Sequence, residues 1–177
     1  MNSAIKQATK TLHENLELLP FNQKMFRGEQ TDDERADYLC SMLEIFSVLD
    51  KHVPDQMKRH PLIEKDLTAL SKPFAEVPRT TNGYVTYLEM ICPDIRPHLY
   101  LNYMGFMYGG QVMKKRYPHA SSMYEFDDIE EQRSFVRQKY VEDYTSQNYP
   151  SYVSEVKHGF RWHIGISEEL GEKFNVE

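Results

Sequence analysis

The chain has 177 residues, 40% of them hydrophobic, and a formal net charge of −6, a length that suits one domain with a full core. The acidic balance argues against general nucleic-acid binding, which needs concentrated positive charge. No apolar run approaches the roughly 20 residues of a membrane span, and the N-terminus lacks a signal-peptide core, so we expect a cytoplasmic protein without membrane contact.

The first half of the chain has the apolar spacing of helices. Pro20 falls inside the first pattern and should kink or end that helix, and Gly28 is a natural stop. Thr31 and Glu34 have the spacing of a capping box, which opens the second helix. The helices expected here cover residues 3–27, 31–53 and 60–72.

The second half continues the helical pattern. Asn82-Gly83 predicts a turn, and Pro150 suits the first position of a last helix that stops at Gly171. The helices expected here cover residues 84–91, for which a strand is the weaker alternative, residues 98–116, a stretch from 127 or 128 to 147, and residues 150–170. The sequence therefore predicts an all-α fold of about seven helices in a single domain, residues 1–177.

Three glycines lie inside the helical pattern of residues 98–116. Gly105, Gly109 and Gly110 each cost a helix interior about 1 kcal/mol relative to alanine. A helix with such a cluster bends there or brings its backbone close to a neighbour. That neighbour is either a flat ligand or another helix, and packing between helices is the commoner case.

A histidine on the first expected helix is a candidate ligand-binding residue. His13 has apolar neighbours, and a histidine in such a place more often packs than binds a ligand. Glu17 lies one turn further on, where its carboxylate can accept a hydrogen bond from the imidazole and fix its tautomer. Lys6 lies two turns before His13 on the same face.

Two stretches together resemble the haem oxygenase family. Residues 6–17, KQATKTLHENLE, resemble its proximal helix, and residues 100–115, YLNYMGFMYGGQVMKK, resemble its distal helix. Residues 59–67 and 160–170 also match in place and order. The resemblance covers nearly the whole chain. It implies an all-α fold in which haem lies between the N-terminal helix and a kinked, glycine-rich distal helix.

The resemblance also implies an activity and a set of contacts. Haem would be both substrate and prosthetic group, opened to biliverdin with release of carbon monoxide and ferrous iron. His13 corresponds to the axial iron ligand and Glu17 to its partner. Lys6 and Tyr100 would hold the propionates, with Arg137 as a candidate for a further basic contact. The other implied haem contacts are Gly105, Phe106, Gly109, Gly110 and Phe160.

The same resemblance implies a protein partner. The reaction needs electrons from an external donor, for which ferredoxin is the candidate. Lys114, Lys115 and Arg116 form a local basic patch in an acidic chain, which suits docking of an acidic partner. The family also makes a monomer the expected state.

One position departs from the family pattern. The family has an aspartate directly after the first glycine of the distal helix, where it anchors water, and this chain has Phe106. Phenylalanine has no polar atom to hold water. His163 stands where the family usually has an asparagine. We therefore hypothesise that His163, with Tyr103 or Tyr108, orders the distal water instead.

Two alternatives remain open from the sequence. A haem-binding relative that has lost ring opening with the aspartate would store or deliver haem, or act as a peroxidase. A di-iron oxidase would use Glu155 and His158, but a second Glu-x-x-His pair is absent. Cys40 and Cys92 form neither a disulfide framework nor a zinc pattern.

Overall fold

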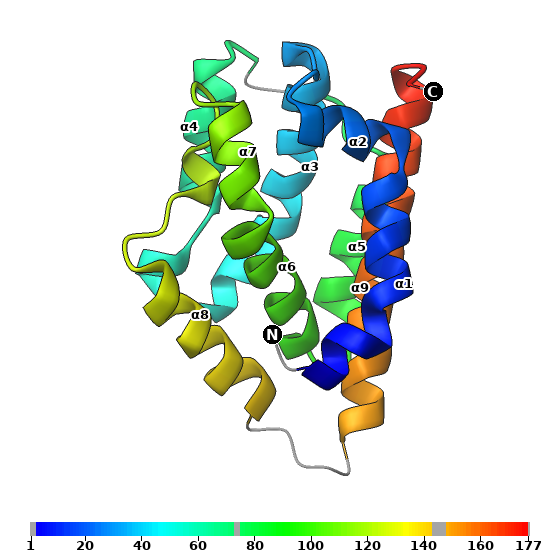
Figure 1. Cartoon of the computed structure of the whole chain (residues 1–177), viewed down its shortest axis with the longest axis vertical. Coiled ribbons are helices and arrows are strands. Elements are labelled where there is room, and N and C mark those ends of the chain that lie inside the picture. Colours follow the sequence, from blue (N-terminus) through cyan, green and yellow to red (C-terminus); the bar gives the residue numbers. More distant parts are fainter. Residues whose placement is uncertain (1–2, 73–74, 143–147, 177) are drawn as a thin grey trace.

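The structure is a computed structural model that describes residues 3–72, 75–142 and 148–176, and these ranges contain helices and no strand. The all-α fold expected from the sequence is confirmed (Figure 1). The α-helices are α1 (Ser3–Leu18), α2 (Pro20–Arg27), α3 (Asp32–Leu49), α4 (His60–Ala69), α5 (Arg79–Thr86), α6 (Arg96–Tyr108), α7 (Gly110–Arg116), α8 (Ile129–Arg137) and α9 (Tyr149–Lys173). Single turns of other helix types lie at Asp50–His52, Asp55–Met57 and Ser122–Tyr124 (3₁₀) and at Tyr87–Ile91 and Gln138–Glu142 (π).

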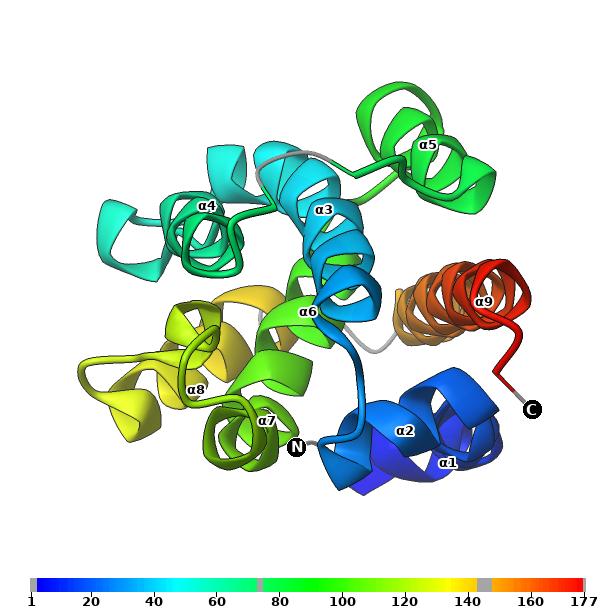
Figure 2. The same ribbon diagram turned by 90° about the horizontal axis from the view of Figure 1, so that it is seen from above.

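The helices pack around α3 and α6. Figure 2 shows both near the centre, with α9 and α1 together on one side and α4 and α8 on the other. α9 packs along both α1 and α6. Most side chains of α3 are buried, and Leu39, Ile45 and Phe46 are wholly inaccessible to solvent. α3 is therefore the central helix of the hydrophobic core.

Local signals in the sequence set several helix ends. The Thr31 hydroxyl accepts a hydrogen bond from the Glu34 amide at 3.2 Å, and the Glu34 carboxylate accepts one from the Thr31 amide at 2.6 Å. This is the expected capping box. α1 ends before Pro20, which begins α2, and Gly28 ends α2 in the left-handed conformation with φ 76°.

The helices expected over residues 31–53 and 60–72 end earlier, at Leu49 and Ala69, and two boundaries expected at glycines are wrong. Asn82-Gly83 is not a turn but part of α5. A Cβ on Gly83 would lie 3.2 Å from the Trp162 ring, so glycine lets α5 pack closely on α9. The last helix does not stop at Gly171 and continues to Lys173.

The number of helices also differs from the sequence prediction. The described ranges hold nine α-helices rather than about seven, partly because Pro20 and Gly109 each divide an expected helix in two. The expected helix from 128 leaves α geometry after Arg137, and its residues 143–147 lie outside the described ranges. None of the described helices is long and apolar enough to cross a membrane.

Candidate functional site

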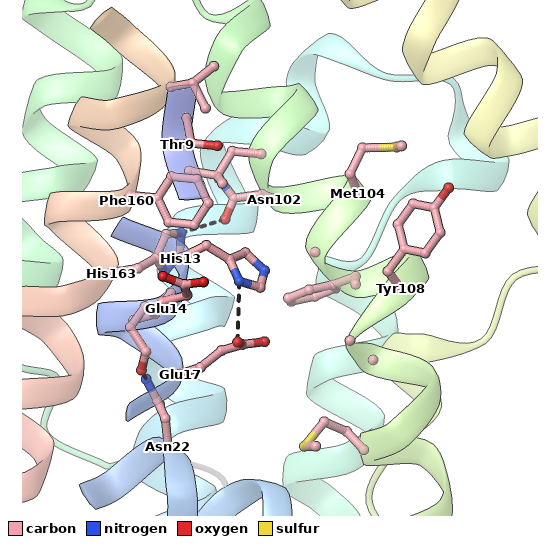
Figure 3. Close-up of a pocket in the computed structure, with 18 of the residues that line it drawn as sticks. Thr9, His13, Glu14, Glu17, Asn22, Asn102, Met104, Tyr108, Phe160 and His163 are labelled. Atoms are coloured by element: carbon pink, nitrogen blue, oxygen red, sulfur yellow. Dashed lines mark hydrogen bonds and ion pairs between the residues drawn. The ribbon is translucent and has the colours of Figure 1, made fainter. Parts of the chain in front are cut away.

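A cavity of about 830 Å³ opens between α1, α6 and α9. This volume lies toward the upper end of the range of roughly 300–1,000 Å³ for small-molecule and cofactor sites. The walls carry residues that the sequence singled out on all three helices, and Figure 3 shows several of them as sticks. These residues are Lys6, His13, Glu17, Tyr100, Gly105, Phe106, Tyr108, Gly109, Gly110, Phe160 and His163.

The α1 wall presents a paired histidine. Nδ1 of His13 lies 3.4 Å from a carboxylate oxygen of Glu17, and the two side chains are about half exposed. The ring of Phe160 on α9 packs edge-on against the imidazole at 5.8 Å between centroids. Figure 3 shows the His13 ring projecting into the cavity. With Nδ1 engaged by Glu17, Nε2 is the nitrogen positioned to bind a ligand.

The three glycines of the opposite wall have different surroundings. A Cβ on Gly105 would meet nothing within 4 Å, so this residue faces open space. A Cβ on Gly109 would lie 3.2 Å from the Gly105 carbonyl oxygen, and α6 ends there. A Cβ on Gly110 would lie 2.4 Å from a ring carbon of Tyr124. Gly105 faces open space and Gly109 meets only a carbonyl of its own helical stretch, so both leave room for a ligand, whereas Gly110 allows a side chain to pack closely.

Basic and hydroxyl groups gather at the cavity but form a smaller set than expected. Lys6 and Lys10 line the α1 wall. The Tyr100 hydroxyl is buried without a hydrogen-bond partner among the described residues, and burial raises the pKa of this phenol. Arg137 does not line the cavity and instead donates a hydrogen bond to the Tyr108 hydroxyl at 2.5 Å.

The wall beside the glycines is aromatic. Phe106 is 7% exposed and packs against Phe46 and Tyr124, with centroids 4.7 and 5.2 Å apart. Tyr103 was expected to face the cavity with His163, and its geometry contradicts that placement. Its hydroxyl is buried and donates a hydrogen bond to Asp50 at 2.6 Å, because its ring packs on the side of α6 that faces α3.

A chain of hydrogen bonds that the sequence did not reveal begins at His163. Its Nε2 lies 2.9 Å from Asn102 Oδ1 (Figure 3). The Asn102 amide nitrogen donates to the His98 backbone carbonyl at 2.9 Å and to the Tyr84 hydroxyl at 3.3 Å. The Tyr84 hydroxyl in turn lies 2.9 Å from His98 Nδ1, and His98 Nε2 lies 3.2 Å from Glu155.

This series of hydrogen bonds fixes the tautomer of His163. A backbone carbonyl only accepts hydrogen bonds, so the Asn102 amide must direct its nitrogen toward His98 and its oxygen toward His163. Nε2 of His163 therefore carries the proton. Burial, together with the nearby His98, lowers the pKa of His163 to about 4. A neutral imidazole with an unprotonated Nδ1 follows, which is an acceptor rather than a donor.

Sequence reasoning missed Asn102 as part of the cavity wall. A signal was present, because Asn102 lies three residues before Gly105 and so shares a helix face with a residue that was singled out. The Glu155–His158 pair on which the di-iron alternative depends does not form, because Glu155 bonds to His98 and Tyr87, whereas His158 packs its ring on Tyr87 and Trp162.

The fold and the site define an all-helical protein with a histidine-bearing cavity. A family model described as "Heme oxygenase" matches residues 1–169. The chain therefore belongs to the haem oxygenase family.

Solved structures from this family have the same fold. A haem oxygenase-1 of the cyanobacterium Synechocystis, solved in complex with haem, superposes with a TM-score of 0.86 over 98% of this chain and 93% of that one, at 18% identity. Haem oxygenase from Leptospira interrogans has a TM-score of 0.81, with 93% and 97% coverage and 20% identity.

Curated relatives match with modest identity. Haem oxygenase 1 of Gallus gallus is 29% identical over 137 residues, which cover 65% of this chain and 46% of that protein. Haem oxygenase of Takifugu rubripes is 24% identical, with 99% and 76% coverage. The chain thus spans about half the length of the first of these relatives.

Proposed function

We propose that this protein binds haem in the cavity and degrades it as an oxygenase. The observation that carries this proposal is the His13–Glu17 pair, which lies across the cavity from the open space at Gly105. A flat macrocycle needs one wall with an axial ligand and an opposite wall without side chains. The family match over residues 1–169 supports the same function and a single domain over residues 1–177.

The residues present fit haem. His13 would bind the iron through Nε2, and Glu17 would hold the ring in place through Nδ1. Lys6 would pair with a propionate, and so would the buried Tyr100 hydroxyl, which lacks a partner among the described residues. Phe160 would support the axial ligand from the side. The bound haem supplies the iron that activates dioxygen, and its own ring is the substrate.

His163 and its hydrogen-bonded chain would control the other side of the cavity. Its unprotonated Nδ1 can accept a hydrogen bond from a water or another donor bound in the cavity. The Asn102 oxygen holds the ring in the required tautomer. Phe106 and its aromatic neighbours would keep water away from the position to which the resemblance assigns the family's aspartate. We propose that His163 orders the distal water by accepting a hydrogen bond from it at Nδ1.

We also propose biliverdin as the product and ferredoxin as the electron donor. Lys114, Lys115 and Arg116 support the docking of an acidic donor because all three are exposed in the last turn of α7. α7 directly follows the glycine-bearing end of α6, which brings the patch near the cavity wall.

A specific observation favours a second candidate function. Phe106, which the sequence resemblance places where the family has its distal aspartate, is buried among aromatic rings. A protein of this kind would bind haem without opening its ring, and would serve in haem storage, delivery or peroxidase chemistry.

An absorption experiment separates these functions. Haemin is added to the protein, and the Soret band is followed before and after ferredoxin, ferredoxin reductase, NADPH and air are supplied. We expect a Soret band that decays as a bilin spectrum appears. A Soret band that persists supports the second candidate, and the absence of a Soret shift overturns haem binding itself.

The axial ligand has its own test. His13→Ala should weaken haemin affinity at least about tenfold and change the Soret maximum, because the imidazole bond to iron is lost. Added imidazole should restore the original spectrum. His119→Ala is the matched control, since His119 is also an exposed histidine but does not line the cavity. A His13→Ala spectrum identical to that of the unsubstituted protein would exclude His13 as the ligand.

A further inference from the structure

Three side chains of the kinds that bind transition metals converge outside the haem cavity. Cys92 follows the π-helical turn Tyr87–Ile91, His98 lies near the start of α6, and Glu155 lies on α9. One ligand atom from each residue lies within 4.8 Å of the other two. In the described part of the chain this is the one group of histidine, cysteine and acidic residues with such a spacing. None of the three lines the cavity.

The three side chains differ in burial, since one is enclosed by the protein and the other two are partly exposed to solvent. The His98 side chain is wholly buried, and the Glu155 side chain is 18% exposed. Cys92 is half-buried on a turn at the surface. A cation can therefore reach the sulfur and the carboxylate from solvent, while packing holds the imidazole in a fixed position.

Neighbouring hydroxyls orient two of the three side chains. The Tyr84 hydroxyl lies 2.9 Å from His98 Nδ1, which leaves Nε2 directed at Glu155, 3.2 Å away. The Tyr87 hydroxyl donates a hydrogen bond to Glu155 Oε2 at 2.6 Å. Metal sites in proteins hold their histidine and carboxylate ligands in place through outer contacts of this kind.

The backbone also directs Cys92 toward the group. The Cys92 amide donates a hydrogen bond to the Tyr87 carbonyl at 2.8 Å, closing a π-type turn. π turns are rare and occur often at functional sites. The wider turn ends in an extended residue at Cys92, with φ −57° and ψ 119°, from which the chain leads into α6 and His98.

We propose that Cys92, His98 and Glu155 bind a divalent cation of the zinc class. A thiolate, an imidazole and a carboxylate form a ligand set that suits Zn²⁺, and with three protein ligands a water completes the tetrahedron. On binding, the Cys92 thiol releases its proton to solvent and Cys92 becomes a thiolate. In the metal-free protein His98 Nε2 carries the proton, because the Glu155 carboxylate beside it only accepts. On metal binding this proton moves to Nδ1, where the Tyr84 hydroxyl oxygen accepts a hydrogen bond from it, and the unprotonated Nε2 binds the metal. This inference stands apart from haem binding and does not depend on it.

Cobalt titration of the full-length, haem-free protein tests the site. Co²⁺ replaces Zn²⁺ in tetrahedral sites and has a thiolate-to-metal charge-transfer band in the near ultraviolet. We expect a single equivalent of Co²⁺ to give this band together with tetrahedral d–d bands in the visible, and Zn²⁺ to abolish both. Cobalt binding without a thiolate band would overturn the proposal, and so would the absence of binding.

The two cysteines provide a matched pair of variants. Cys92→Ser should abolish the thiolate band, and Cys40→Ser should keep it, because Cys40 is buried in α3 away from the group. His13→Ala should also keep the band. Tyr87→Phe removes only the bond to Glu155 and should weaken cobalt affinity about tenfold. Circular dichroism of each variant verifies folding. A band that survives Cys92→Ser or disappears in Cys40→Ser would refute the assignment.

Discussion

At the scale of single residues, the most informative one is His163. Its ring is neutral because burial and the neighbouring His98 lower its pKa to about 4 from the ordinary value of 6.5. Asn102 leaves Nδ1 as the unprotonated nitrogen. The family's aspartate can only accept hydrogen bonds when ionised, and a neutral imidazole held in this tautomer offers the same acceptor character at a different position. If His163 orders the distal water as proposed, this chain keeps a hydrogen-bond acceptor in the cavity without the negative charge of an aspartate.

The lowered pKa makes stability depend on pH. Between pH 6.5 and about 4, His163 is protonated in the unfolded chain but not in the folded protein. The free energy of unfolding therefore falls as the pH falls through this window. The loss is at most about 3 kcal/mol and is complete below pH 4. Urea unfolding of the haem-free protein at several pH values measures it.

His163→Gln is the control for this pH effect. It removes the titration and keeps an amide that can donate a hydrogen bond to Asn102. The difference in stability between the two proteins should therefore shrink as the pH falls from 6.5 to 4, since other titrating groups contribute equally to both. Parallel stability profiles across this window would show that His163 titrates at its ordinary pKa in the folded protein.

At the scale of helices, alanine substitutions at two glycines of the same stretch should change the stability of the protein in opposite directions. Gly110→Ala places a methyl group 2.4 Å from the Tyr124 ring and should destabilise the protein by about 1–3 kcal/mol. Gly105→Ala meets open space and should stabilise the haem-free protein by up to about 1 kcal/mol, because alanine favours the helix. The Gly105→Ala methyl projects from a cavity wall, so haemin affinity should fall at least about tenfold.

Thermal unfolding and haemin titration of the two variants check this prediction. Gly165→Ala on α9 is a milder comparison for Gly110→Ala, since its Cβ would lie 3.0 Å from a terminal methyl group of Thr80. If Gly105→Ala leaves haemin affinity unchanged, the haem does not lie against α6 at that point.

Features set within one helix turn were predictable from the sequence. The Thr31–Glu34 capping box, the break at Pro20 and the His13–Glu17 pair each depend on residues within four positions of one another. Contacts between distant segments were not predictable in this way. Nothing in the local spacing around Asn102 indicates that it meets His163, 61 positions away, because that contact arises when α6 packs on α9.

Distant packing explains the wrong predictions as well. Gly83 has a turn-forming sequence, yet it belongs to α5, where the missing side chain leaves room for the Trp162 ring. Tyr103 shares the glycine-bearing helix with the cavity residues, but its hydroxyl finds Asp50 at the end of α3. Glu155 meets His98 and not the residue one turn along its own helix, and this exchange creates the proposed metal site.

At the scale of the whole molecule, the cavity has one weakly anchored wall. Among the described side chains of α1, only Ile5 and Thr9 are buried, whereas most of α3 is inaccessible to solvent. Helices with little buried apolar surface open at lower free-energy cost than core helices. The amides of α1 should therefore exchange with deuterium much faster than those of α3 in the haem-free protein. Haemin should slow exchange in α1 selectively, and equal protection of α1 and α3 without haemin would contradict this.

Under the proposed function, the sparse anchoring of α1 would also tie the lifetime of the protein to haem. A ligand present at 100 times its dissociation constant stabilises a folded state by about 2.7 kcal/mol, and here that energy would hold α1 in place through His13. If the protein opens haem as proposed, α1 would return to its readily opened state after each turnover and would then be more accessible to a protease. The abundance of the protein in a cell would then follow the haem supply without any change in its synthesis.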